Sequence, residues 1–245
     1  MNKEVRDVVI GWALAFIVFI IITVVLSSVR GHVVRKRQHE LEASLLGTPI
    51  VPFHSVQTGD IIICAQPARG LTPFHLAAVD HVGIVIRLDH MDQILVAHAR
   101  FATPCVVVIP LSSFANIDQE RNFYVRRISP ALPVDSITRM MESVHRRSCY
   151  RYDVTVLFDF TMRHLQSMTT LPSLSAVSGD EYQGRRTYCT HLVLQMLEDL
   201  GLLKCPLGFV LPEDFIGDNG DILNANLSAH YQYLPLAKLG VATGL

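Results

Sequence analysis

The chain has 245 residues and a formal net charge of −1, and half of its residues are hydrophobic. This length suits one medium-sized domain with a substantial core. The near-neutral charge, without a basic stripe interleaved with aromatic residues, argues against a nucleic-acid-binding protein. The five cysteines are odd in number and show neither metal-ligand nor disulfide-framework spacing. We therefore expect a reducing compartment and no cofactor.

An uncharged, apolar run occupies residues 8–26 near the N-terminus. A helix of about 20 residues crosses the hydrocarbon core of a bilayer, so this run is long enough to span a membrane. A cleaved signal peptide is the alternative, but its apolar region would be too long and two acidic residues precede it. Basic residues follow the run at Arg30, Arg35, Lys36 and Arg37. The positive-inside bias predicts a single-pass membrane protein with a cytoplasmic C-terminal domain.

Composition divides the chain into four segments. After the apolar run, a charged pattern of helical spacing ends at Gly47 and Pro49. The expected segments are a short N-terminal tail (1–7), a transmembrane anchor (8–27), a basic juxtamembrane stalk (28–47) and a globular domain (48–245).

Short β-branched runs separated by polar turns follow in the globular domain. Strands are expected at residues 61–64, 81–88, 93–98, 105–109 and 122–128, with a possible edge strand at 230–234. Because consecutive strands have short links, they indicate an antiparallel sheet in an α+β fold.

Helical spacing of apolar residues predicts helices over residues 135–147 and 189–200. Thr187 is the expected N-cap of the second helix, which places Cys189 in its first turn. Residues 169–186 are rich in Ser, Gly and Pro, so we expect a loop over the site.

Three residues are candidates for chemistry: Cys189, His81 and His98. A thiol is a nucleophile only as the thiolate, which a helix N-terminus and a neighbouring imidazole both favour. His81 begins an apolar strand, and His98 lies on the next strand, where it can orient the ring of His81. Singly, each has a structural interpretation: Cys189 as a buried core cysteine, and the histidines as core residues with satisfied hydrogen bonds. Together they match a nucleophile, a base and an orienting group.

Several motifs carry a resemblance to a known superfamily. Gly-Asp-Ile-Ile-Ile from residue 59, His-Val-Gly-Ile-Val-Ile from residue 81 and Val-Ala-His-Ala from residue 96 resemble the papain-like, NlpC-type cysteine peptidases. In ordinary members the cysteine helix precedes the histidine strand, whereas Cys189 follows it. This order resembles the circularly permuted branch of lecithin–retinol acyltransferase-like and bacterial amidase-like proteins. Tyr152-Asp153 and the segment 211–215 resemble that branch as well, and the likeness covers most of residues 55–216.

The resemblance implies a permuted papain-like fold, with an antiparallel sheet packed against the helix that bears the nucleophile. It implies Cys189 as nucleophile, His81 as general base and His98 as third catalytic residue. Permuted relatives often carry an acid where this chain has His191, and several carry glutamate in place of His98. These departures leave the substrate class open.

The expected function is that of a membrane-anchored cysteine hydrolase or acyltransferase. It would act on an amide or ester bond, in a lipid acyl or peptide substrate, through a thioester intermediate. One alternative is a catalytically inactive, membrane-tethered interaction protein on the same fold, because a fold does not establish a function. Another is a metal site built from His81, His98, Cys189 and His191, although the sequence has no CxxC or HxxxH pair there.

Overall fold

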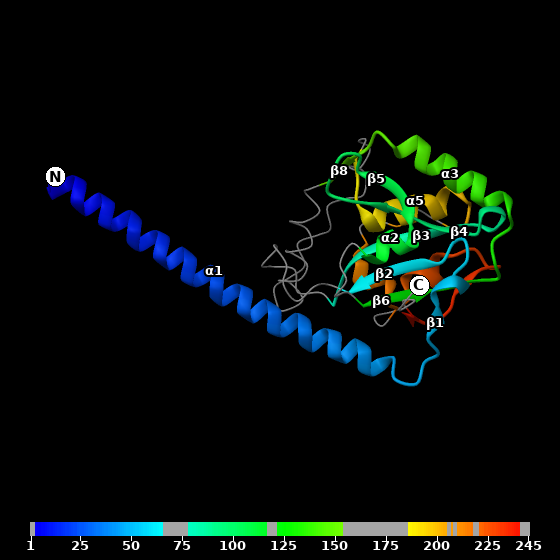
Figure 1. The fold of residues 1–245 in the computed structure, drawn as a ribbon, viewed down its shortest axis with the longest axis horizontal. Helices are drawn as coiled ribbons and strands as arrows, with labels where there is room; N and C mark the ends of the chain where they lie inside the picture. Colours follow the sequence, from blue (N-terminus) through cyan, green and yellow to red (C-terminus); the bar gives the residue numbers. More distant parts are fainter. Residues whose placement is uncertain are drawn as a thin grey trace.

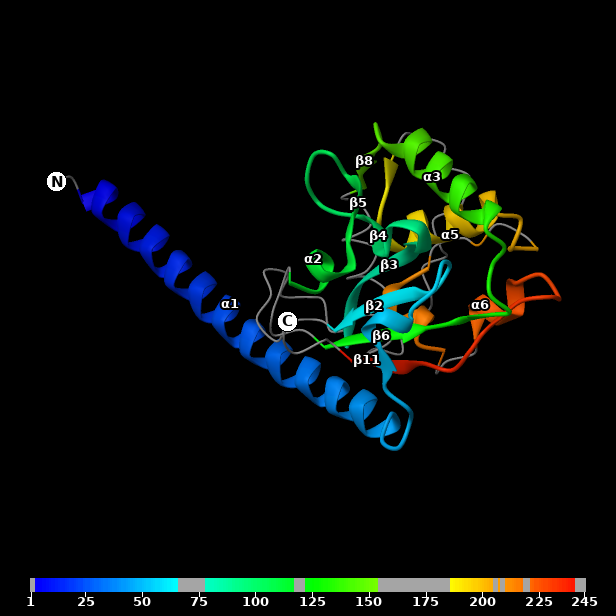
Figure 2. The same ribbon diagram turned by 45° about the vertical axis from the view of Figure 1, so that its right-hand side comes forward.

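The computed structural model shows a long N-terminal helix projecting from a mixed α/β domain (Figure 1, Figure 2). This helix, α1 (Lys3–Ser44), is continuous across the predicted anchor and stalk. The residues that the structure describes are 3–65, 78–116, 122–153, 186–204, 207, 210–217 and 221–240, without many of the side chains of the first 30 residues.

A seven-stranded sheet forms the centre of the domain. In spatial order its strands are β1 (Val51–Pro52), β11 (Ala237–Gly240), β6 (Phe123–Arg126), β2 (Ile61–Ala65), β3 (Val79–Leu88), β4 (Gln93–Ala99) and β5 (Val106–Pro110). Neighbouring strands are antiparallel, except that β1 runs parallel to β11. The predicted, mostly antiparallel sheet is therefore confirmed, and the arrangement is compatible with the predicted α+β class.

Two small sheets flank the central one. The first pairs β7 (Ile128–Ser129) with β10 (Gln232–Tyr233), and the second pairs β8 (Arg151–Tyr152) with β9 (Arg186–Thr187). The edge strand predicted near the C-terminus is thus present as β10, and the strand predicted over residues 122–128 divides into β6 and β7.

The helices of the domain cover both faces of the sheet. They are α2 (Leu111–Asn116), α3 (Asp135–Arg147), α5 (Cys189–Asp199) and α6 (Ile222–Asn226), with single 3-10 turns η1 (Phe53–Ser55), η2 (Asp89–Met91) and η4 (Pro212–Phe215). The helices predicted over residues 135–147 and 189–200 are confirmed, and Cys189 is the first residue of α5.

The predicted N-cap at Thr187 is wrong. The N-cap of α5 is Tyr188, and its side chain makes no capping hydrogen bond. Thr187 is the last residue of β9, where its backbone pairs with Tyr152. It therefore belongs to a strand and lies one residue before the N-cap. The Thr187 hydroxyl donates instead to the carbonyl of Tyr188 at 3.4 Å. Apart from Arg186, the predicted loop over residues 169–186 lies outside the described residues.

Alternation along the strands divides the core into two layers. Ile61 and Ile63 of β2 pack with the apolar face of α5, whereas Ile62 of β2 packs with Phe114 of α2 on the opposite face. Helices α2 and α5 accordingly lie on opposite sides of β3 and β4 (Figure 2). Any site at these strands therefore has an α2 face and an α5 face.

The predicted membrane span over residues 8–27 is not supported. A search of the described residues finds no helix that has both the length and the apolar content needed to cross a bilayer. Most side chains of that segment lie outside the described part of the chain.

The C-terminal part of α1 packs on the domain rather than standing apart from it. Val34 and Leu41 are buried. Glu42 accepts hydrogen bonds from the Tyr124 hydroxyl at 2.7 Å and from the Lys238 ammonium at 2.9 Å. These contacts attach the helix to β6 and β11 of the central sheet.

Candidate active site

His81 and His98 lie side by side on neighbouring strands. Nε2 of His81 is 2.9 Å from Nδ1 of His98, and the rings meet edge to face at 87°. The ladder pairs Ile84 with Ala97, so His98 faces Gly83, two residues from His81 on the same face. A Cβ at Gly83 would come within 3.3 Å of the Cβ of His98 and 2.5 Å of the Val96 side chain. Only glycine leaves room there for the paired imidazoles.

Burial keeps His98 neutral. Its side chain is 2% exposed. Desolvation, with a smaller effect of the Arg100 charge, lowers its pKa to about 4. Its Nε2 has no hydrogen-bond partner among the described residues, and its Nδ1 makes the contact with His81.

Cys189 is fully buried at the start of α5. Desolvation, with a smaller effect of the nearby Asp80 charge, raises the pKa of its thiol to about 12. The backbone N–H groups of Val82, Thr190 and Cys189 itself donate to the sulfur and act in the opposite direction. The resting thiol is therefore neutral, and it lies against the backbone of the residue that follows His81.

A register shift between β2 and β3 lies next to His81. Cys64 pairs with His81, but Ala65 pairs with Val79, so Asp80 is an extra residue on β3. Such bulges bend a strand and re-aim its side chains. The imidazoles lie on the α2 face, as their contacts with Phe114 show, and the thiol belongs to the core layer of α5. The structure thus brings His81 and His98 together on the α2 face, whereas Cys189 lies beside Val82 in the layer on the α5 face.

Phe114 contacts both imidazoles from α2. Its ring centroid is 5.8 Å from that of His81 and 5.0 Å from that of His98. Phe114 is 2% exposed. The sequence reasoning did not identify this residue, because nothing in the pattern of residues 111–116 indicates a contact with strands β3 and β4.

Tyr152 also lies near the candidate residues. The sequence indicated it only as part of the Tyr152-Asp153 motif. Its phenol interacts with the thiols of Cys189 and Cys105 and with Asp80. Burial, and then these groups, hold its pKa well above the usual range, so the phenol stays protonated and can donate a hydrogen bond.

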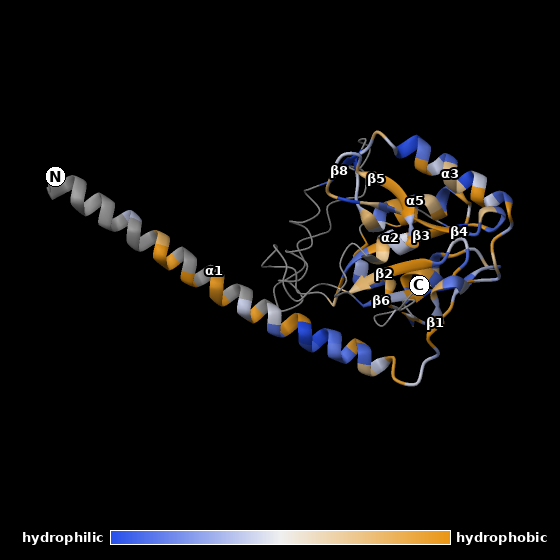
Figure 3. Ribbon diagram, viewed as in Figure 1, coloured by the Kyte–Doolittle hydropathy of each residue, from blue (hydrophilic) through white to orange (hydrophobic). Residues whose placement is uncertain are grey.

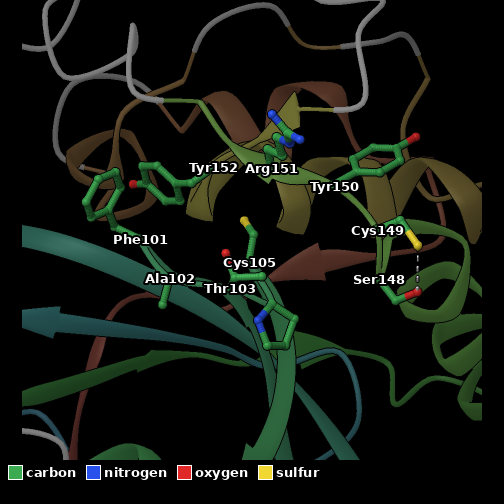
Figure 4. Close-up of a pocket in the computed structure, with 10 residues that line it drawn as sticks. Phe101, Ala102, Thr103, Cys105, Ser148, Cys149, Tyr150, Arg151 and Tyr152 are labelled. Carbon is green, nitrogen blue, oxygen red and sulfur yellow. Dashed lines mark hydrogen bonds between the residues drawn. The ribbon is translucent and has the colours of Figure 1, made fainter.

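A pocket of about 620 Å³ adjoins the site. It lies between the loop 101–105 and the segment 148–152, and Tyr152 forms part of its wall. In Figure 4, Phe101 and Tyr152 stand at one end, Tyr150 at the other, and Arg151 lies above the Cys105 thiol. The Phe101 and Tyr152 rings meet edge to face at 5.8 Å. The pocket offers aromatic walls and one cation to a ligand.

His191 belongs to the same helix as Cys189 but to a different environment. Its ring is 5.4 Å from that of Tyr188. Burial and the Arg147 charge lower its pKa to about 4, against an opposing effect of Asp153. Within the described ranges, no group of three or more His, Cys, Asp or Glu side chains is placed to hold a metal ion.

Comparisons with known proteins identify no family. No protein-family model matches the chain, and no curated protein sequence does. Among solved structures, it is similar to the metalloprotein yiiX of Escherichia coli O157:H7, a DUF1105 protein. The TM-score is 0.41 at 18% identity, over 73% of this chain and 96% of that chain. A likeness of this size supports no inference about function.

Proposed function

We propose that the protein is a cysteine hydrolase or acyltransferase that forms a thioester on Cys189, with His81 as general base and His98 as the residue that orients it. The contact between His81 Nε2 and His98 Nδ1, at 2.9 Å, carries the proposal. Because this contact occupies Nε2, Nδ1 of His81 is the nitrogen that would take the thiol proton. A neutral, buried His98 fixes the ring without competing for that proton.

The proposed reaction begins with a protonated thiol, because burial raises the pKa of Cys189 to about 12. Proton transfer to His81 would accompany the attack of sulfur on an ester or amide carbonyl. The backbone N–H at the start of α5 and the Tyr152 phenol are suited to donate to the oxyanion. His81 then returns the proton to the leaving group, and water, an amine or an alcohol cleaves the thioester.

The pocket beside Tyr152 is the proposed site for the substrate. Its aromatic walls suit an apolar or peptide group, and Arg151 suits a neighbouring anion. A lipid acyl group and a peptide bond both satisfy this description.

Membrane contact through α1 is part of the proposal. Large apolar side chains are exposed on this helix, with Trp12 at 75%, Phe16 at 64% and Ile21 at 56%. Figure 3 shows the apolar middle of α1 giving way to a hydrophilic end near the domain. An exposed apolar surface of this kind favours insertion into lipid, with the basic flank and the domain on the cytoplasmic side. Resistance of the full chain to extraction from membranes by alkaline carbonate would support this, and release into the supernatant would contradict it.

A specific observation favours the second candidate, a membrane-tethered interaction protein without activity. Cys189 is only 1% exposed. A buried, neutral thiol is inert unless substrate binding and the imidazole activate it together. The two candidates differ in whether Cys189 becomes acylated.

Acylation of the full-length protein in detergent tests the proposal. The protein is mixed with a p-nitrophenyl acyl ester, and peptide mapping locates acyl groups that neutral hydroxylamine removes. The exposed Cys149, which also lines the pocket, is the competing thiol. We expect acylation of Cys189 at least about tenfold faster than that of Cys149, falling to the background rate in His81→Gln, since general base catalysis contributes about 10²-fold or more. Acylation of Cys149 with an unmodified Cys189 would instead support the interaction protein.

A further inference from the structure

We infer that Phe114 is a positioning residue for the catalytic imidazoles: one aromatic ring, delivered by α2, packs against both His81 and His98 and fixes their mutual orientation. This inference rests on the proposed function, in which His81 must present one particular nitrogen to the thiol. It adds a residue to which the proposed reaction assigns no chemical step.

The ring geometry supports this role. The plane of the Phe114 ring lies at 31° to the His81 ring and at 76° to the His98 ring. Phe114 therefore packs in a tilted arrangement against one imidazole and meets the other edge to face. Both arrangements are favourable aromatic contacts. A planar wall against one ring and an edge against the other restricts rotation of both side chains about χ2. Without such restriction, either imidazole could rotate and exchange the nitrogen that the proposed reaction needs.

Exclusion of water is the second consequence. Phe114 belongs with Leu111 and Ala115 to the buried apolar cluster on the α2 face. His98, which contacts Phe114, is buried, whereas His81 is partly exposed. A hydrogen bond between two imidazoles is easily replaced by bonds to water when water has access. The ring of Phe114 therefore protects the His81–His98 contact as well as aligning it.

A matched control residue is present in the same core layer. Phe123 of β6 is 3% exposed, and its ring centroid is 6.2 Å from that of Phe114. The ring contact given for it in the described part of the chain is with Phe114 and not with an imidazole. Replacing either phenylalanine by leucine removes one buried ring from one apolar cluster. Only the replacement of Phe114 removes the wall against the histidines.

The kinetic test compares Phe114→Leu, Phe123→Leu and Phe114→Tyr in the full-length protein. Thermal unfolding first establishes that the two leucine variants fold and lose similar stability. For p-nitrophenyl ester turnover, we expect Phe114→Leu to lower kcat about tenfold with KM changed less than twofold, an effect typical of misplaced catalytic groups. Phe123→Leu should keep kcat within twofold, and Phe114→Tyr, which keeps a ring, should restore most of the loss. Equal kcat values in the two leucine variants would overturn the inference.

A second readout follows the imidazoles directly, by NMR titration of the histidine side chains. The groups that face His98 are Arg100, just after the end of β4, and His81 on β3. Phe114 from α2 and Val107 opposite His98 on β5 are uncharged. We expect Phe114→Leu to raise the pH at which His98 titrates, because water then reaches a ring that burial keeps neutral. Phe123→Leu should leave that titration unchanged.

The two readouts separate failure of the inference from failure of the proposed function. If the wild-type protein forms no acyl-enzyme on Cys189, the proposed function fails, and the titration alone decides the role of Phe114. A His98 titration that moves in Phe114→Leu but not in Phe123→Leu supports the positioning role in either case. Identical titrations in both variants and the wild type overturn it.

Discussion

Tyr152 combines two roles that a single substitution can separate. Its ring forms a wall of the pocket against Phe101, and its phenol lies near the Cys189 thiol. Phenylalanine keeps the wall and removes the donor. We expect Tyr152→Phe to lower kcat for ester turnover by about 10- to 100-fold, near the loss of one oxyanion donor, with little change in KM.

Steady-state kinetics of the full-length protein across several acyl esters measure this effect. The pattern that would contradict the assignment is a raised KM with an unchanged kcat, which would make Tyr152 a part of the pocket wall alone. Phe101→Leu is the matched control, because it alters the same ring contact and leaves the phenol in place.

The candidate residues differ in how far the sequence could predict them. His81 and His98 could be placed together because strand alternation and a short turn determine which residues of a hairpin share a face. Cys189 could be placed at a helix start because the apolar spacing begins there. Phe114 could not be predicted, since its role depends on a six-residue helix folding back over the sheet. The Thr187 cap failed because pairing with Tyr152 in the small parallel sheet outweighed a local capping preference.

At the scale of elements, α1 shows what helical periodicity leaves open. The charged pattern over residues 33–46 indicates a helix, but it does not say which side meets the domain. That side is determined by long-range contacts, such as the pair between Glu42 and Tyr124. Arg37 adds a contact with Glu213 at 3.4 Å, and Glu213 also accepts from the backbone N–H of Ala78, next to the start of β3. The stalk is thereby linked to the strand that carries His81.

Removing the Tyr124 hydroxyl tests whether this packing stabilises the domain. Tyr124 is fully buried and donates to Glu42 at 2.7 Å. Tyr124→Phe should lower the free energy of unfolding by about 1–2 kcal/mol, because a hydrogen bond to a charged group is lost while Lys238 still pairs with the carboxylate. Tyr231→Phe is the control, because the Tyr231 hydroxyl makes no hydrogen bond in the described part of the chain. Urea unfolding that gives the same free energy for both variants would mean that α1 contributes no stability through this contact.

For the molecule as a whole, buried titratable groups act on stability in opposite directions. Burial lowers the pKa of His98 and of His191 from 6.5 to about 4. Their contribution to stability is complete above the unfolded pKa of 6.5 and is lost as the pH falls toward 4, because the unfolded chain then binds protons that the folded chain excludes. Burial raises the pKa of Asp60 from 3.8 to about 6. Its contribution is complete below 3.8 and is lost as the pH rises through 6.

Two histidines therefore oppose Asp60 in the same pH range, and Glu213, whose pKa burial also raises, adds a smaller opposing contribution. Each of the first three changes of pKa corresponds to about 3 kcal/mol, so the free energy of unfolding should fall by up to about 3 kcal/mol between pH 7 and pH 4. Below that range, the lowered pKa values of Asp199 and Asp221 add a further loss, since these paired carboxylates favour the folded state only while ionised. Urea unfolding of the full-length protein at a series of pH values measures the curve.

Two variants show which titratable groups cause this pH dependence of the free energy of unfolding. His191→Gln removes one titrating histidine that takes no part in the proposed reaction, so most of the loss between pH 7 and pH 4 should disappear. Asp60→Asn removes the larger opposing group, so the loss should become about twice as large, whatever the substitution does to stability at neutral pH. If His191→Gln leaves the slope unchanged, the histidine is protonated as readily in the folded chain as in the unfolded one. Water would then reach the His191 ring, and the burial inferred for this side of α5 would be wrong.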